Sequence, residues 1–121
     1  MEDDFFVPGH ITGLFTIQDG GGDILHQGSV GAGFSITRGV RTSVTLGNPD
    51  GADDQIYLNG IQKDDAEVSR TVIALFRDQL KKINRTWENP LIVRHSIEVP
   101  IGSGFGSSGA GALSLAYGLN R

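Results

Sequence analysis

The first part of the chain alternates short apolar runs with turn-forming residues. The apolar run Phe5–Val7 stops at Pro8-Gly9, and a second run extends from Ile11 to Ile17 before the glycine-rich turn at 19–23. Short apolar runs bounded by proline, glycine and aspartate are typical of strands and the turns between them. The pattern therefore predicts an edge strand, a bend at Pro8-Gly9 and a second short strand.

A longer alternating segment follows. Phe34 and Ile36 alternate with small or polar residues, and after Arg38-Gly39 the alternation resumes through Val40–Leu46. Alternation with period two places every second side chain on one face of a sheet. We interpret the segment as a hairpin with one buried face that turns at Arg38-Gly39.

The middle of the chain predicts a turn, a brief strand and a helix. Asn48–Gly51 and Asn59-Gly60 are turn signals on either side of a strand at Gln55–Leu58. A helix is predicted over residues 64–83, with Asp64 or Asp65 as its N-terminal cap. The apolar residues at helical spacing are Val68, Val72, Leu75, Phe76, Leu80 and Ile83.

The last segment predicts a strand, a glycine-rich loop and a second helix. Apolar residues alternate with polar ones from Leu91 to Val99, and the strand ends at Pro100. Small and apolar residues from Ser107 onward predict a tightly packed helix that reaches Arg121. Such a helix needs a cover for its apolar face, so we expect the chain to be a fragment or to require a second chain. The order of strands, helix, strand and helix indicates an α+β fold.

Composition narrows the class of protein. At 121 residues with 38% hydrophobic content, the chain fits one small domain. A net charge of −4 gives no positive field for nucleic acid or an anionic membrane, so we expect neither as a partner. The absence of cysteine excludes disulfides and cysteine-based metal sites. The acidic start lacks the features of a signal peptide, no segment is long and apolar enough to span a membrane, and a cytoplasmic location is expected.

Glycine is over-represented, with 18 residues, and its placement points to ordered loops. The glycines cluster at 20–22, 28–33 and 102–111, each beside periodic apolar sequence. At the third cluster a strand delivers the loop into a helix N-terminus, where backbone N–H groups and the helix dipole favour an anion such as phosphate. A purely structural loop that caps the helix is the alternative.

Two well-known phosphate motifs fit this loop poorly. A Walker A loop needs a lysine after its second glycine, and no lysine occurs after Lys82. A dinucleotide fingerprint is formally present at Gly104, Gly106 and Gly109. The preceding strand is not uniformly apolar, however, and too few residues remain for the acidic ribose partner. Hydroxyls at Ser107 and Ser108 would lie in the first helical turn, where serine can cap the helix, bind Mg²⁺ or donate to a phosphate oxygen.

The whole stretch PIGSGFGSSGA resembles the second conserved motif of the GHMP kinases. The match comprises Pro100, Ile101, Gly102, Ser103, Gly104, Phe105, Gly106, Ser107, Ser108, Gly109 and Ala110. In that family this loop and the following helix embrace the phosphates of ATP, and a motif serine helps to hold Mg²⁺. The resemblance therefore implies ATP and Mg²⁺ as cofactors, with Ser107 or Ser108 as the metal ligand. It also implies the N-terminal lobe of the ribosomal protein S5 domain 2-like fold, with a mixed or antiparallel sheet and helices on one face.

The beginning of the chain resembles the same family. Pro8-Gly9-His10 is similar to the first motif, which lies near the acceptor substrate and often has lysine or arginine where His10 stands. The segments VPGHITGLFTI and GSVGAGFSITRGV are similar to the opening of archaeal pantoate kinases, which act on the route to coenzyme A. The resemblance thus implies phosphorylation of pantoate, with His10 as the catalytic residue and the acceptor near residues 28–33.

The acceptor site has further candidates. Ser29, Gly31 and Arg38 are assigned to substrate binding, and Arg41 and Arg94 are other cations that suit a carboxylate. His26 and His95 are expected to be structural, since no metal-ligand cluster accompanies them.

Alternative functions remain open at this stage. The chain resembles other GHMP kinases as well, acting on homoserine, mevalonate or a sugar, and a non-catalytic nucleotide-binding or assembly module is a further alternative. The family also carries a third glycine-rich motif and an acidic residue beyond the second motif, neither of which lies within residues 1–121. We therefore expect an incomplete N-terminal ATP-binding domain that is inactive alone. It would need a C-terminal portion or a second chain, with a homodimer as one arrangement.

Overall fold

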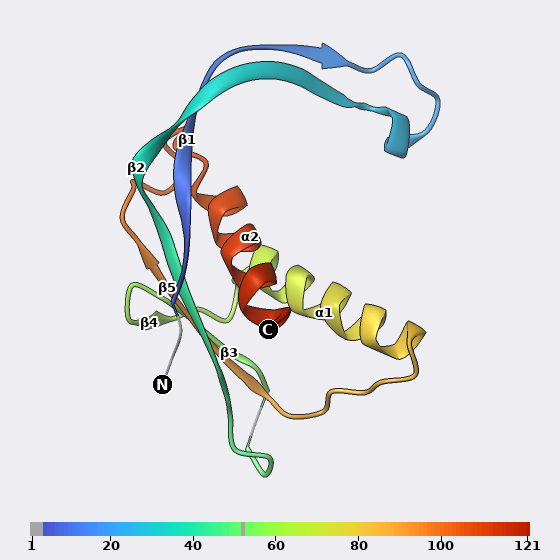
Figure 1. Ribbon diagram of the computed structural model, residues 1–121, viewed down its shortest axis with the longest axis vertical. Coiled ribbons are helices and arrows are strands. Elements are labelled where there is room, and N and C mark those ends of the chain that lie inside the picture. The colour runs from blue at the N-terminus through green and yellow to red at the C-terminus, as the bar shows by residue number, and fades with distance from the viewer. Residues whose placement is uncertain (1–3, 52) are drawn as a thin grey trace.

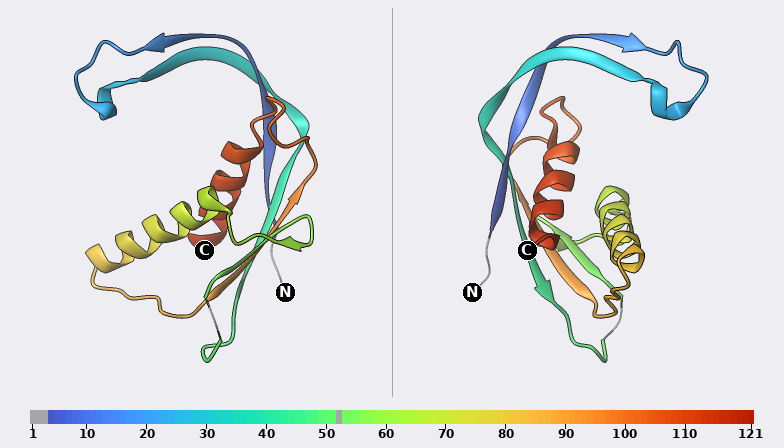
Figure 2. Two further views of the ribbon diagram at one scale, coloured as in Figure 1. Left: turned by 180° about the vertical axis from the view of Figure 1, so that it is seen from behind. Right: turned by 45° about the vertical axis from the view of Figure 1, so that its right-hand side comes forward.

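The computed structural model describes residues 4–51 and 53–121, so the first three residues of the acidic start lie outside the described part. Five strands form one mixed sheet in the order β1-β2-β5-β3-β4, and both helices cover the same face of it (Figures 1 and 2). The elements are β1 Phe5–Gln18, a short 3-10 helix η1 Ile24–His26, β2 Gly28–Leu46, β3 Gln55–Leu58, β4 Ile61–Gln62, α1 Glu67–Lys82, β5 Leu91–Ile97 and α2 Ser107–Leu119. Among the described strands, β3 and β5 pair in parallel and the other neighbours pair antiparallel. The α+β fold is confirmed.

The core lies between the sheet and the two helices, in two clusters. The larger cluster contains Ile56, Ile73, Leu91, Val93 and Leu115, all almost completely buried. The smaller one joins Val7, Val40 and Ala110. The helix that packs against β1 and β2 is therefore α2, and α1 packs by Ile73 against β3 and β5. The first strands thus pack mainly on α2 and not on the helix predicted over residues 64–83.

β2 is one continuous strand, so the predicted turn at Arg38-Gly39 was wrong. Residues 28–42 pair with β1, and residues 40–46 pair with β5. A Cβ atom at Gly39 would lie 2.1 Å from the carbonyl oxygen of Val7. Glycine is required there because two backbones approach closely, and not because the chain reverses. The cluster at 28–33, expected to be a loop, likewise lies inside β2.

β1 is also continuous, where two short strands were predicted. Its pairing with β2 shifts register between Pro8 and His10 and again between Thr12 and Leu14. These irregularities replace the expected bend, because extra residues in a ladder curve a strand without ending it. We call the far half of this pair, residues 11–34, the arm. Figure 1 shows the arm curving away from the rest of the sheet on the side of the helices.

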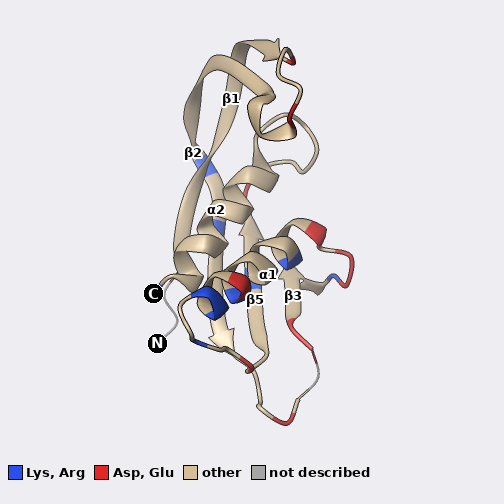
Figure 3. Cartoon of the chain, turned by 90° about the vertical axis from the view of Figure 1, so that its right-hand side faces the viewer, with Lys and Arg blue, Asp and Glu red and all other residues tan. Residues whose placement is uncertain are grey.

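α1 differs from its prediction in cap and in buried face. It begins at Glu67 after Ala66, and no side chain caps it, so neither Asp64 nor Asp65 takes that role. Its buried residues are Ser69 and Ile73. Val68, Leu75 and Ile83, assigned to the apolar face, are exposed. The two helices differ in polarity as well, since α1 carries charges of both signs and α2 carries none (Figure 3).

The turns at Asn48–Gly51 and Asn59-Gly60 are confirmed. The N–H of Gly51 donates to the carbonyl of Asn48 at 2.8 Å. Asn59 and Gly60 have φ angles of 50° and 82°, the left-handed conformation of a tight hairpin turn, which here connects β3 to the short strand β4. Among the described residues, no helix is long and apolar enough to cross a membrane.

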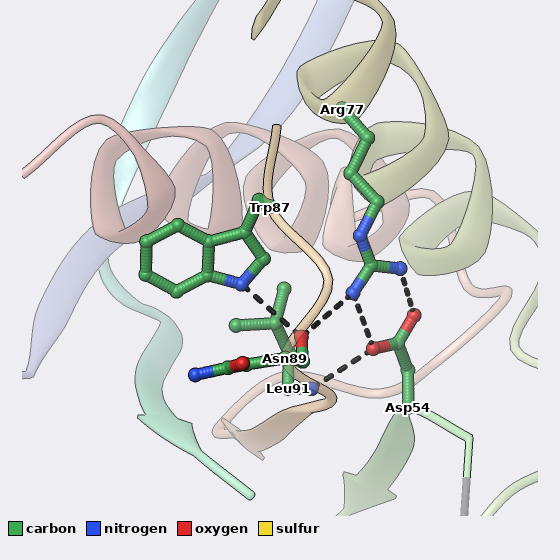
Figure 4. Close-up of polar contacts among 5 residues, drawn as sticks. All are labelled: Asp54, Arg77, Trp87, Asn89 and Leu91. Carbon is green, nitrogen blue, oxygen red and sulfur yellow. Dashed lines mark hydrogen bonds and ion pairs between the residues drawn. The ribbon is translucent and has the colours of Figure 1, made fainter. Parts of the chain in front are cut away.

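A part-buried ion pair fastens α1 to the sheet (Figure 4). Arg77 donates from both terminal nitrogens to the carboxylate of Asp54, and the backbone N–H of Leu91 donates to the same carboxylate at 2.9 Å. Arg77 and the indole of Trp87 both donate to the carbonyl of Asn89 at 3.1 Å. Burial alone would raise the pKa of Asp54, but the hydrogen bonds from Arg77 and Leu91 and the charge of Arg77 lower it overall.

Candidate functional site

The glycine-rich loop between β5 and α2 has the backbone conformation that only glycine adopts readily. Gly102, Gly104 and Gly106 have φ angles of 71°, 81° and 69°. A Cβ atom at Gly102 or Gly104 would meet nothing within 4 Å, so it is the backbone conformation that requires glycine there. Gly106 is the residue before the first turn of α2, whose leading N–H groups have no partner within the helix. The loop therefore ends at a set of backbone donors suited to an anion.

The two motif serines open α2 with different exposure. Ser107 is buried and Ser108 is exposed. Neither caps the helix, because Gly106 occupies the cap position and no side chain bonds there. Within the described residues neither hydroxyl takes part in a hydrogen bond, so the serines do not have the capping role that was one of their three possible roles. Binding of a metal or a phosphate oxygen stays a prediction.

The loop is held in place by β1. The backbone N–H of His10 donates to the carbonyl of Phe105 at 2.9 Å. A Cβ atom at Gly106 would lie 3.5 to 3.7 Å from the Cβ and backbone atoms of His10. The two segments singled out in the sequence, Pro8–His10 and Pro100–Ala110, therefore meet directly.

An apolar pocket of about 150 Å³ lies beside this loop. The first turns of both helices form two of its walls, and the sheet forms its floor. The residues that line it are Val40, Leu58, Ala66, Glu67, Val68, Ser69, His95, Ile97, Ile101, Ser107, Ser108, Gly111 and Ala112. The pocket is continuous with the loop through the two serines, so one ligand can contact both.

A buried chain of hydroxyl groups and one imidazole joins the two helices beneath this pocket. His95 contacts the hydroxyl of Ser69 in α1 at 2.9 Å and that of Thr42 in β2 at 2.7 Å. Thr42 in turn contacts Ser114 of α2, which donates to the carbonyl of Gly111 at 3.1 Å. Burial lowers the pKa of His95 to about 4, so the imidazole is neutral near pH 7.

The order of these contacts determines which group donates and which accepts in each hydrogen bond. Because Ser114 donates to Gly111, it accepts from Thr42, and Thr42 then accepts from the Nδ1–H of His95. The Nε2 atom of His95 therefore accepts from Ser69. The buried, hydrogen-bonded position of His95 agrees with a structural role, but its partners were not foreseen. A usable signal existed, since His95 occupies an apolar position in the alternation from Leu91 to Ile97.

A second pocket, of about 430 Å³, lies on the arm. Its lining residues are His10, Thr12, Phe15, Ser29, Gly31, Ala32 and Gly33. The structure thus brings together three residues assigned to the acceptor site from the sequence, namely His10, Ser29 and Gly31. Their roles stay predictions.

The arginines proposed for the acceptor site lie outside this pocket. Arg38 and Arg41 both pair with Glu98, at 3.7 and 3.1 Å. The guanidinium of Arg41 also lies 4.7 Å from the ring centre of Phe6, and that of Arg94 lies 5.1 Å from the ring centre of Tyr57. Each cation therefore has a partner outside the arm pocket, and the pocket has His10 as its ionisable lining residue.

Comparison with known proteins identifies the relationship. The chain is 36% identical over 116 residues to the pantoate kinase of Methanocaldococcus jannaschii, covering 96% of this chain and 38% of that protein. This chain is homologous to part of a GHMP kinase. A solved phosphotransferase related to the coenzyme A biosynthesis pathway superposes with a TM-score of 0.78 at 26% identity, covering 99% of this chain and 39% of that one.

Other GHMP kinases share the fold. The mevalonate kinase of Methanococcus jannaschii superposes with a TM-score of 0.60 at 15% identity, again over 99% of this chain and 39% of that one. A scan against protein-family profiles finds no match. The chain thus spans about two fifths of the length of the GHMP kinases it matches, which is consistent with an N-terminal portion.

Proposed function

We propose that this chain forms the phosphate-binding part of an ATP-dependent GHMP-type kinase that phosphorylates a hydroxyl group of pantoate in coenzyme A biosynthesis. The observation that carries the proposal is the loop with left-handed Gly102, Gly104 and Gly106 that opens α2 beside His10. The 36% identity to a pantoate kinase supports the choice of acceptor.

Two pockets are available for the two substrates. The phosphates of ATP would lie along the loop, where backbone N–H groups and the α2 N-terminus favour negative charge, and the base would lie in the adjoining apolar pocket. The acceptor would occupy the arm pocket, with the His10 imidazole and the Ser29 hydroxyl available to its polar groups. Orientation of two bound reactants accounts for much of the catalysis of phosphoryl transfer.

The residues also fit a magnesium ion. The described residues contain no group of three or more His, Cys, Asp or Glu that could hold a metal. Mg²⁺ characteristically binds through few protein ligands together with substrate phosphates, and the unbonded hydroxyls of Ser107 and Ser108 suit that mode. When bound, ATP would supply the phosphoryl group and Mg²⁺ would offset the negative charge of its phosphates.

Completion of the active site would come from elsewhere. The matched kinases are more than twice as long as this chain. We place the third glycine-rich motif and the acidic residue implied by the family in a further portion of the polypeptide or in a second chain.

ADP release by the complete polypeptide tests this function. Purified protein with Mg²⁺–ATP is offered pantoate, mevalonate, homoserine and galactose in parallel. We expect turnover with pantoate and background rates with the others. Turnover with mevalonate but not pantoate would exclude the proposed acceptor, and the absence of any Mg²⁺–ATP affinity would favour the non-catalytic assembly module.

A further inference from the structure

His10 contacts both candidate ligand sites, through different parts of the residue. Its backbone N–H holds the carbonyl of Phe105 in the glycine-rich loop. Its imidazole lines the arm pocket and lies over Gly33, where a Cβ atom would come within 2.6 Å of Cε1 and 2.8 Å of Nε2. One residue of β1 therefore stands between the two sites.

A β-bulge makes this double contact possible. Pro8 is opposite Gly39, whereas His10 is opposite Ser35, so β2 contributes three residues where β1 contributes only Gly9. At such an irregularity a backbone N–H leaves the strand ladder and becomes available to another partner. Here the N–H of His10 bonds to the loop instead of to β2.

Gly9 allows the loop to approach β1 this closely. A Cβ atom on Gly9 would lie 2.9 Å from the carbonyl oxygen of Phe105 and 3.2 Å from that of Arg38. Both atoms belong to the backbone, so they cannot rotate away as the end of a side chain would. Any residue with a side chain at position 9 must therefore push the loop away from β1 or distort the bulge.

We propose that Gly9 and His10 form a joint that fixes the phosphate loop relative to the acceptor pocket. Gly9 is a positioning residue for the loop, the backbone of His10 anchors the loop, and the imidazole of His10 orients the acceptor. The assignment of acceptor and phosphate to these two sites rests on the proposed function, whereas the joint itself rests on the contacts described. The joint would matter for catalysis, because misplacement of reacting groups by about 1 Å can lower the rate about a hundredfold.

Two substitutions distinguish the backbone role of the joint from its side-chain role. Every residue except proline has a backbone N–H, so His10→Gln keeps the anchor to Phe105 and changes only the arm pocket. Gly9→Ala keeps the imidazole but displaces the loop. Gly20→Ala is the matched control, because a Cβ atom at Gly20 meets nothing within 4 Å.

The test combines ATP titration calorimetry with steady-state kinetics on the complete polypeptide, with circular dichroism to confirm folding. We expect Gly9→Ala to weaken ATP binding by about tenfold or more, in the absence of any acceptor. We expect His10→Gln to leave the Kd for ATP within about twofold of the parent value while it raises the KM for pantoate by about tenfold. Gly20→Ala should match the parent in both measurements.

Several outcomes would overturn the joint. Equal weakening of ATP binding by His10→Gln and Gly9→Ala would show that the two roles are not separate. A Gly9→Ala protein with parental ATP affinity would show that the loop does not depend on Gly9. If the parent phosphorylates no acceptor, the proposed function fails, but the joint is still tested by hydrogen exchange. Gly9→Ala should then accelerate exchange of the His10 amide, and an unchanged rate in a folded variant would refute the joint.

Discussion

Acidification should destabilise the fold through His95. The imidazole is buried, and among the described residues its hydrogen-bond partners are the hydroxyl groups of Ser69 and Thr42, with no carboxylate to stabilise a positive charge. Its two nitrogens are both used, one as donor and one as acceptor. A second proton would turn the accepting nitrogen into a donor facing the Ser69 hydroxyl, and would charge a group that burial keeps neutral.

The magnitude follows from the two pKa values. The pKa of His95 falls from 6.5 to about 4 in the fold, so the unfolded chain takes up the proton first as pH decreases. The contribution of His95 to the free energy of unfolding therefore decreases as pH falls below 6.5. The decrease levels off near pH 4, where the folded state also takes up the proton. Between pH 7 and pH 5 the loss from this residue amounts to about 2 kcal/mol.

Urea denaturation of the parent and of His95→Gln at pH 7 and pH 5 measures this effect. Glutamine does not titrate, so the loss of stability between the two pH values should be smaller in the variant by about 2 kcal/mol. His26→Gln is the control, because it makes the same replacement at a histidine whose side chain is 74% exposed instead of buried. Contributions from Asp54 are common to all three proteins and cancel. Parallel losses in the parent and His95→Gln would refute a neutral, buried His95.

Three further substitutions have defined outcomes. Asp54→Asn removes the charge that pairs with Arg77, and urea denaturation should show a loss of about 1–3 kcal/mol; a loss below about 0.5 kcal/mol would mean that the pair behaves as an exposed one. Gly106→Val places a β-branched residue at a φ of 69°, so a calorimetric titration should show ATP affinity reduced by at least about tenfold, and parental affinity would contradict the phosphate loop. Gly39→Ala would bring a Cβ atom to 2.1 Å from the carbonyl of Val7, and thermal melting should show a markedly lower Tm than the parent, whereas an unchanged Tm would contradict the close pairing of β1 and β2.

The loop and the helix after it could be predicted because their signals are local. Left-handed glycines, a helix start at Ser107 and the strand before them all lie within a few residues of one another. The turn at Asn59-Gly60 was predictable for the same reason. In each case the backbone conformation requires a particular residue type, so the residue type in the sequence indicates the conformation.

Features that depend on distant partners were predicted poorly. Gly39 was interpreted as a turn because the sequence does not distinguish a chain reversal from the close approach of Val7. The face of α1 was misassigned at Leu75 because several apolar residues lie on its exposed side, and contact with the sheet selects Ile73 instead. The ion pair between Arg77 and Asp54 joins α1 to the start of β3, and no local sequence pattern predicts it. Tertiary contacts override local propensity in these cases.

The anchor between His10 and Phe105 also bears on the order in which the chain can fold. Almost the whole described chain separates these two residues, and the larger core cluster forms from residues 56–115 without β1. Contacts between distant segments require closure of long loops and so tend to form late. The β1 segment is synthesised early, yet its contact with the loop can form only after Phe105 has been made. We therefore expect the contact between β1 and the loop to form late in folding, so that a chain with an intact larger core cluster can still lack it.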